Sequence, residues 1–259
     1  MTAAFSCSGC RLAAFRAEFS VRSSRIARSS TVAETLEITA LDGAGTFNAY
    51  CAGPADARAG IVVIQEIFGI NPGIRSMVDG WGAAGYRAAA PDLFWRQRPG
   101  IELDPDVPDE MQQAFGLYQG FDVDKGIADL EASIRALRHD GCQKVGVVGY
   151  CMGGFLAYLC ATRTDSDASV GYYGVGIDGK LGEAHAIARP LLLHVASQDH
   201  FVPPEAQAKV HAELDSHPRV TLHDYPADHA FARAVGSSRV EALASQADAR
   251  TAAFFKEHL

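Results

Sequence analysis

A cysteine between two glycines is the clearest chemical signal in the sequence. Cys151 stands in the run Gly149-Tyr-Cys-Met-Gly153, after an apolar segment and before a helix-like one. Small residues two positions before and after a nucleophile let a strand and a helix meet at a sharp turn, as in the Gly-x-Ser-x-Gly motif. The helix N-terminus at such a turn favours a thiolate, and the N–H of Met152 would point at a developing oxyanion. The pattern predicts Cys151 as a nucleophile in acyl transfer.

An aspartate and a histidine follow later strand-like segments in the order that a catalytic triad needs. Where the nucleophile lies at this kind of turn, the acid and then the base come after it along the chain. Asp199 follows the segment 190–196, and His229 follows the segment 219–225. Each therefore lies just beyond the carboxyl end of an expected strand, where parallel sheets bind ligands. His200 is the main rival as base, but it neighbours Asp199 in sequence and would point elsewhere.

The elements that must position these residues alternate between strand and helix patterns. A hairpin is expected from 36–40 and 46–52, and the proline-rich segment 96–109 predicts a loop. Repeated strand–helix units imply an α/β fold, a mostly parallel doubly wound sheet with helices on both faces. The remaining expected strands are 60–65, 86–90, 144–149, 169–173, 190–196 and 219–225. The expected helices are 71–85, 123–138, 152–162, 203–214 and 239–259.

Composition and charge limit the function classes. The chain has 259 residues, 48% of them apolar, but no run long enough to predict a transmembrane helix. Six cysteines are ordinary for a reducing compartment. The first 33 residues hold five arginines and one acid, so the other 226 carry a net charge of −12. An acidic body argues against nucleic acid or an anionic membrane as partner, while a few arginines would still hold a small anion.

Residues 1–33 differ in composition from the rest. They are rich in Arg, Ser and Ala, which is typical of an organellar transit peptide, and an inert extension is the alternative. Cys7 and Cys10 are spaced like a metal or redox pair, but no second pair follows, so no metal site is expected. We therefore expect an extension over 1–33 and a single domain over 34–259. We expect a cytoplasmic protein, or an organellar one if the extension is a transit peptide.

Six segments, taken together, resemble the dienelactone hydrolase (carboxymethylenebutenolidase) family. They run in the family's order as QEIFG at 65–69, PDLFWR at 91–96, GYCMGG at 149–154, VGYYGVG at 170–176, QDHFVP at 198–203 and HAFAR at 229–233. The resemblance implies an α/β-hydrolase fold and an enzyme that opens the lactone ring of 4-carboxymethylenebut-2-en-4-olide to maleylacetate in aromatic-compound degradation. A departure in the loop 96–109 would change the lactone that is accepted.

The matching motifs also imply roles for individual residues. Cys151, Asp199 and His229 would form the triad, and Glu66 would be the acid that holds the resting thiol. The oxyanion would be bound by the N–H groups of Met152 and Ile67.

Substrate binding is assigned in the same way. Arg96 and Arg233 would bind the substrate carboxylate, and Tyr172 and Tyr173 would line the pocket or serve as core aromatics. No metal or organic cofactor is needed. The expected partner is a small anionic lactone, and we expect the chain to act as a monomer.

Two other functions stay open at this point. One is a general hydrolase of small esters or lactones, which turnover of a neutral aryl ester would distinguish. The other is a non-catalytic thiol sensor or ligand-binding protein on the same fold, which any esterase activity that depends on Cys151 would exclude.

Overall fold

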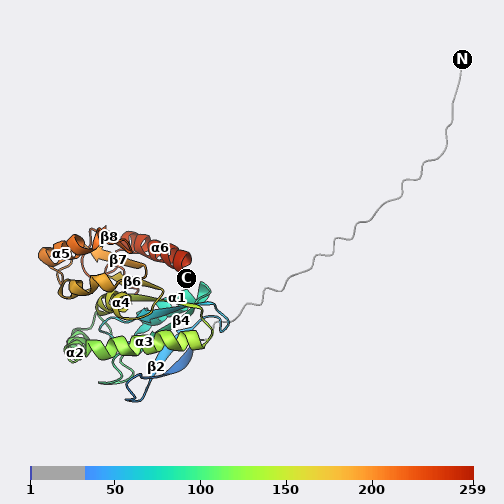
Figure 1. The fold of residues 1–259 in the computed structure, drawn as a ribbon, viewed down its shortest axis with the longest axis horizontal. Coiled ribbons are helices and arrows are strands. Elements are labelled where there is room, and N and C mark those ends of the chain that lie inside the picture. The colour runs from blue at the N-terminus through green and yellow to red at the C-terminus, as the bar shows by residue number, and fades with distance from the viewer. Residues whose placement is uncertain (2–32) are drawn as a thin grey trace. The chain divides into compact units, whose positions relative to one another are not determined.

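The computed structural model describes residues 33–259 together with Met1 (Figure 1). Most of the expected N-terminal extension, including Cys7 and Cys10, lies outside the described residues. The expectations for that segment therefore stay predictions.

One eight-stranded sheet runs through the described residues in the order β1-β2-β4-β3-β5-β6-β7-β8. The hairpin β1–β2 is antiparallel, β2 pairs antiparallel with β4, and every later pairing is parallel. The α/β sheet predicted from the sequence, with its antiparallel N-terminal hairpin, is confirmed. The strands are β1 Glu34–Thr39, β2 Thr46–Ala52, β3 Ala59–Ile64, β4 Arg87–Pro91, β5 Lys144–Tyr150, β6 Ala168–Tyr172, β7 Leu191–Ala196 and β8 Val220–Tyr225.

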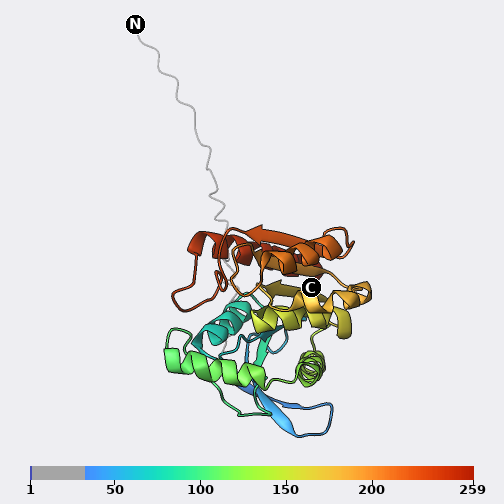
Figure 2. The ribbon, with the colours of Figure 1, turned by 90° about the vertical axis from the view of Figure 1, so that its left-hand side faces the viewer.

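Helices cover both faces of this sheet, as the two views of the ribbon show (Figures 1 and 2). Helices α1 and α6 contribute to one buried cluster, and α3, α4 and α5 contribute to the other. The side chains of Asn71 and Asp122 accept hydrogen bonds from the first turns of α1 and α3, which satisfies N–H groups that the helices leave free. The helices are α1 Pro72–Ala83, α2 Pro108–Gln119, α3 Val123–His139, α4 Met152–Arg163, the 3₁₀ helix η1 Ile177–Ala186, α5 Pro204–Leu214 and α6 Glu241–His258.

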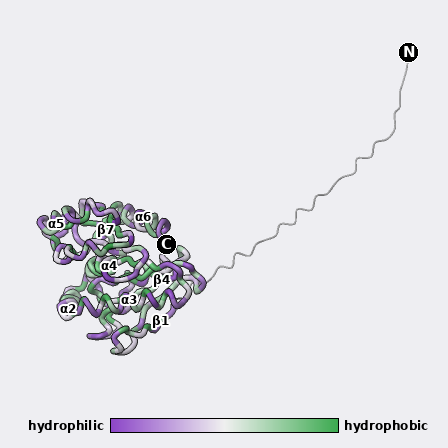
Figure 3. The backbone as a smooth tube through the Cα atoms, in the orientation of Figure 1, coloured by the Kyte–Doolittle hydropathy of each residue, from purple (hydrophilic) through white to green (hydrophobic). Residues whose placement is uncertain are grey.

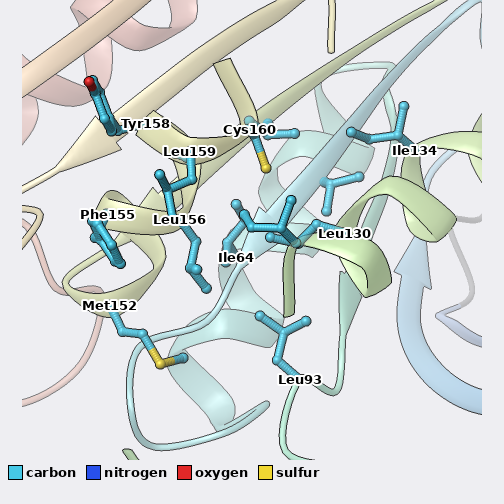
Figure 4. Packing of buried hydrophobic residues seen from close by; sticks show 14 of the residues in the cluster. Ile64, Leu93, Leu130, Ile134, Met152, Phe155, Leu156, Tyr158, Leu159 and Cys160 are labelled. Carbon is cyan, nitrogen blue, oxygen red and sulfur yellow. The ribbon is translucent and has the colours of Figure 1, made fainter. Parts of the chain in front are cut away.

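Helix α4 is the most deeply buried helix of the site. Ten of its twelve residues are buried, so it is apolar nearly all round, as its colour in Figure 3 shows. Figure 4 shows its side chains Phe155, Leu156 and Leu159 beside Ile64 of β3 and Leu130 of α3. This packing fixes the start of α4, and with it Cys151, against the middle of the sheet.

Two helices were not predicted from the sequence. Residues 177–186 form η1, and α2 begins inside the stretch that was expected to be a loop. Helix α2 buries Ala114 alone, and its first residues belong to the proline-rich stretch that predicts a loop. Within the described part of the chain, every helix is too short or too polar to span a bilayer.

Candidate active site

Cys151 lies at a sharp turn between β5 and α4. Its backbone has φ 56° and ψ −115°, a conformation that L-residues rarely adopt, and its side chain is half-buried. A Cβ on Gly149 would lie 2.0 Å from the carbonyl oxygen of Gly153, and one on Gly153 would lie 2.5 Å from that of Ile64. The two glycines are thus required by close backbone contacts, and these contacts present Cys151 at the N-terminus of α4.

His229 and Asp199 form a buried pair in loops beyond β8 and β7. Nδ1 of His229 lies 2.7 Å from Oδ2 of Asp199, and the two side chains are 5% and 1% exposed. The N–H of Phe201 donates to the other carboxylate oxygen, which fixes the orientation of Asp199. This arrangement directs Nε2 of His229 away from the aspartate, as a general base requires.

Nε2 of His229 is buried and has no hydrogen-bond partner of normal geometry among the described residues. Burial lowers the pKa of this ring, but hydrogen bonds to Asp199 and to the Cys151 thiol outweigh burial and raise the pKa to about 10. Cys151 and His229 also line the same cavity. Cys151, His229 and Asp199 have the arrangement of a nucleophile, its base and the group that orients the base.

His200, the alternative to His229 as the base, lies at the surface. Its Nδ1 lies 2.7 Å from Oδ1 of Asp228, and both side chains are well exposed. His200 and Asp228 thus form a hydrogen-bonded pair with each other at the surface.

The cavity above Cys151 has apolar walls. Cys151, His229 and Arg233 line it, as do the expected oxyanion residues Met152 and Ile67. The rest of the lining is Phe68, Met111, Phe115, Tyr118, Val175 and Phe201. The cavity can thus place an ester beside the thiol while most of the surrounding surface is hydrocarbon.

Helix α2 forms one wall of the cavity, which was not predicted from the sequence. Met111, Phe115 and Tyr118 all line the cavity, and Phe115 and Tyr118 stay 38% exposed. Their spacing of four and three residues places them on one face of a helix. That spacing was a signal in the sequence, but it lay beside a stretch that its prolines marked as a loop.

Glu66 and Arg233 are joined by two hydrogen bonds at the cavity. Nε and Nη2 of Arg233 donate to the two carboxylate oxygens over 2.9 and 3.1 Å, and both side chains are less than 10% exposed. The guanidinium also lies over the ring of Phe68, 5.1 Å from its centroid. In this state, Arg233 is occupied by Glu66, and the pair is electrically neutral.

Arg96 does not reach this cavity, contrary to the role that the resemblance implied. Its guanidinium binds both carboxylate oxygens of Asp129 at 2.7 and 3.0 Å and also donates to Asp42. The Asp129 side chain has no exposed surface, and a buried carboxylate needs a cation and donors. The sequence placed Arg96 near the carboxyl edge of the sheet, but this buried acid on α3 determines where its side chain points.

Tyr172 also lies away from the cavity, and Tyr173 is the tyrosine beside the base. The Tyr172 hydroxyl is hydrogen-bonded to Thr251 at 2.6 Å, and its side chain is fully buried. Tyr173 follows the end of β6 with φ 38°, and its ring meets that of His229 edge-on at 5.1 Å. Neither tyrosine is among the residues that line this cavity, but Tyr173 contacts the ring of the base that does.

Comparisons with known proteins agree on one family. The model of the dienelactone hydrolase family matches residues 47–259. Carboxymethylenebutenolidase 1 of Cupriavidus pinatubonensis is 43% identical over 224 residues, which are 85% of this chain and 95% of that protein. The carboxymethylenebutenolidase of Pseudomonas putida is 42% identical over 221 residues, 84% of this chain and 93% of that protein.

A solved structure shares the fold. The dienelactone hydrolase-like promiscuous phosphotriesterase P91 from metagenomic libraries has a TM-score of 0.70 to this chain. The match covers 87% of this chain and 98% of that one at 20% sequence identity, so the likeness concerns the fold alone.

Proposed function

Because the chain belongs to the dienelactone hydrolase family of carboxylic-ester hydrolases with the α/β-hydrolase fold, we propose that it opens an anionic enol lactone of the dienelactone type. The product would be maleylacetate, and the reaction would serve aromatic-compound degradation. One observation carries the proposal: Cys151, the His229–Asp199 pair and the carboxylate-binding group Arg233 all meet at one cavity.

The proposed reaction begins at Cys151. Its thiolate attacks the lactone carbonyl, and the oxyanion accepts hydrogen bonds from the N–H groups of Met152 and Ile67. The ring C–O bond then breaks, the acyl group stays on Sγ as a thioester, and the ring oxygen leaves as an enolate. An enolate is a good leaving group and takes up a proton to become the ketone of the product.

Hydrolysis of the thioester is the second half of the reaction. His229, held by Asp199, removes a proton from water, and the resulting hydroxide adds to the thioester carbonyl. The bond to Sγ breaks, which releases the second carboxylate and returns the thiol. The buried Nδ1 bond of 2.7 Å keeps Nε2 available for both steps.

Glu66 and Arg233 provide a means to couple substrate binding to the state of the thiol. A substrate carboxylate would compete with Glu66 for the guanidinium, since both present two oxygens to the same donors. Glu66, once released, would be free to accept the proton of Cys151. One arginine would bind the substrate carboxylate, because Arg96 is held by Asp129.

A general hydrolase of small neutral esters is the second candidate. The cavity walls are mostly apolar, and Arg233 is the one arginine or lysine among the described lining residues. An ester without a carboxylate would leave the Glu66–Arg233 pair intact and still reach Cys151.

Steady-state kinetics with two substrates would test the proposal. The wild type should have a higher kcat/KM for the dienelactone than for a neutral aryl ester such as p-nitrophenyl acetate. Turnover of both should require Cys151. Equal or higher kcat/KM for the neutral ester would favour the general hydrolase and overturn the dienelactone assignment.

A further inference from the structure

We propose that the Tyr173 hydroxyl is a positioning group that donates a hydrogen bond to the Glu66 carboxylate when a substrate carboxylate takes Arg233 from it. The inference rests on the proposed function, because it concerns how an anion gains access to Arg233. It assigns Tyr173 a role in selecting anionic over neutral substrates.

The first observation is that this hydroxyl is buried without a partner. Tyr173 is 2% exposed, and its hydroxyl oxygen makes no hydrogen bond within the part of the chain that the structure describes. Tyr172 and Tyr158, which are buried as deeply, both use their hydroxyls, one toward Thr251 and the other toward the carbonyl of Lys180. A buried hydroxyl that stays unpaired reduces stability, so its presence calls for an explanation outside the resting fold.

The second observation is the location of Tyr173. Its ring contacts the rings of His229 and Phe231 at 5.1 and 5.6 Å. Its backbone N–H donates to the carbonyl of His194 at 2.8 Å, which holds the residue at its positive φ. Backbone strain of this kind persists where the surrounding structure enforces it, and it is concentrated at functional sites.

The third observation is the charged groups near the hydroxyl. Burial raises the pKa of Tyr173 well above its usual value, and the largest charge effect on that pKa comes from Glu66, followed by smaller effects that include those of Arg233 and Cys151. The hydroxyl therefore stays protonated and remains a donor. Glu66 is the charged group with the largest effect on it.

These observations combine when Arg233 changes partner. In the resting state, both oxygens of Glu66 accept hydrogen bonds from Arg233, and the Tyr173 hydroxyl donates to neither of them. Glu66 is only 4% exposed, and a buried carboxylate that loses its donors is strongly disfavoured. A hydroxyl that is ready to donate lowers this penalty. Without it, Glu66 would compete harder for Arg233 and anions would bind more weakly.

The test compares Tyr173→Phe with the matched variant Tyr172→Phe. Tyr173→Phe should lower kcat/KM for the anionic lactone about 10-fold or more, which corresponds to the loss of a hydrogen bond to a charged group. The fall for a neutral aryl ester should be clearly smaller, and the melting temperature should stay the same or rise. Tyr172→Phe should lower the melting temperature and leave the ratio of the two kcat/KM values as it is.

Two further measurements separate this inference from the proposed function. Alkylation of Cys151 by iodoacetate, an anion, and by iodoacetamide, a neutral reagent, needs no turnover. Tyr173→Phe should lower the ratio of the iodoacetate rate to the iodoacetamide rate. In a Glu66→Gln background, Tyr173→Phe should have no further effect on that ratio, because the charge that it serves is gone.

The outcomes are distinct. A wild type that fails to open the dienelactone while Tyr173→Phe still shifts the alkylation ratio would overturn the proposed function and keep the role of Tyr173. An alkylation ratio that is equal in wild type and Tyr173→Phe, or a shift that persists in Glu66→Gln, would overturn the role of Tyr173.

Discussion

Glu66 and Arg233 lie 167 positions apart in the sequence and meet through two hydrogen bonds of 2.9 and 3.1 Å at the cavity beside Cys151. Glu66 follows the end of β3, while Arg233 lies in the loop that carries His229. Arg233 can bind a carboxylate, but in this structure it already binds the carboxylate of Glu66. Any anion that binds there has to replace a carboxylate of the protein.

Replacing Arg233 should affect anionic substrates selectively. In Arg233→Ala, the substrate carboxylate loses its charged hydrogen bonds, and kcat/KM for the dienelactone should fall roughly 10- to 150-fold. The change also leaves the buried Glu66 unpaired and should lower stability, so the selective loss is read from the ratio of kcat/KM for the dienelactone to kcat/KM for a neutral aryl ester. Arg96→Ala is the control. Because Arg96 binds the buried Asp129, this change should lower stability by about 3–5 kcal/mol and leave substrate preference unchanged. If Arg96→Ala lost the preference for the anionic substrate and Arg233→Ala kept it, the assignment of Arg233 as the carboxylate-binding residue would be wrong.

Cys151→Ala should abolish turnover of either substrate without unfolding the protein, because the side chain is half-buried and Ala keeps the Cβ. Cys151→Ser should also be poor, since a hydroxyl needs much stronger activation than a thiol. Mass spectrometry of the wild type during turnover should detect an acyl group on Cys151. Cys142→Ala, at a buried cysteine that does not line the cavity, should retain activity. Near-normal turnover by Cys151→Ala would exclude this nucleophile.

The pKa of His229 should depend on both of its partners. It is raised to about 10 even though burial opposes the shift, so Asp199→Asn and Cys151→Ala should each lower it. An NMR titration of the ring protons would measure the change. His211 serves as the control: burial lowers its pKa, but Asp215 and Asp224 raise it overall, and neither variant should move it. An unchanged His229 titration in both variants would contradict the hydrogen-bonded arrangement.

The same shift predicts how stability depends on pH. The pKa of His229 in the folded chain lies above its unfolded value of about 6.5, so the folded state binds the proton more tightly. Its contribution to stability is fully present below about pH 6.5 and is lost as the pH rises toward 10. The melting temperature should therefore fall more steeply between pH 7 and pH 10 in the wild type than in His229→Gln. Parallel curves for the two proteins would count against the raised pKa.

Gly153→Ala should disrupt the turn that presents the nucleophile. The new Cβ would lie 2.5 and 2.6 Å from the carbonyl oxygens of Ile64 and Gln65, so β3 and α4 would have to separate. Overpacking of this kind destabilises by about 1–3 kcal/mol, and activity should fall with it. Gly80→Ala is the matched control, because nothing lies within 4 Å of a Cβ on that exposed helical glycine. It should be neutral or stabilising by up to about 1 kcal/mol in chemical unfolding.

Much of the fold could be predicted from local patterns. The hairpin, the buried strands and the helices 71–85 and 123–138 each have a periodicity or a boundary residue that reflects how they are buried. Helix α2 was missed because it begins in a proline-rich stretch, although Met111, Phe115 and Tyr118 have helical spacing. It buries Ala114 alone, and these three side chains line the cavity.

The directions of some side chains at the site could not be predicted, because they depend on partners that are distant in sequence. Chain order and strand ends placed Cys151, Asp199 and His229 at one edge of the sheet, because that edge is fixed by topology. The direction of Arg96 was not fixed in this way, since it depends on Asp129 of a distant helix. Tyr173, whose ring meets His229, has φ 38°, a backbone angle that the sequence does not specify.

Three non-glycine residues of the described chain have positive φ values, and all three lie at or next to the reacting groups: Cys151, Tyr173 and Ala230. Each such conformation costs of order 1–3 kcal/mol, so the folded chain is less stable than its core alone would allow. Ala230 follows His229, and Ala230→Gly would relieve strain there while giving the base more freedom to move. Directed evolution for heat resistance is therefore expected to select changes around these positions, and such changes should slow turnover. Heat-resistant variants that keep full activity should instead carry substitutions in the outer helices, such as Gly80→Ala.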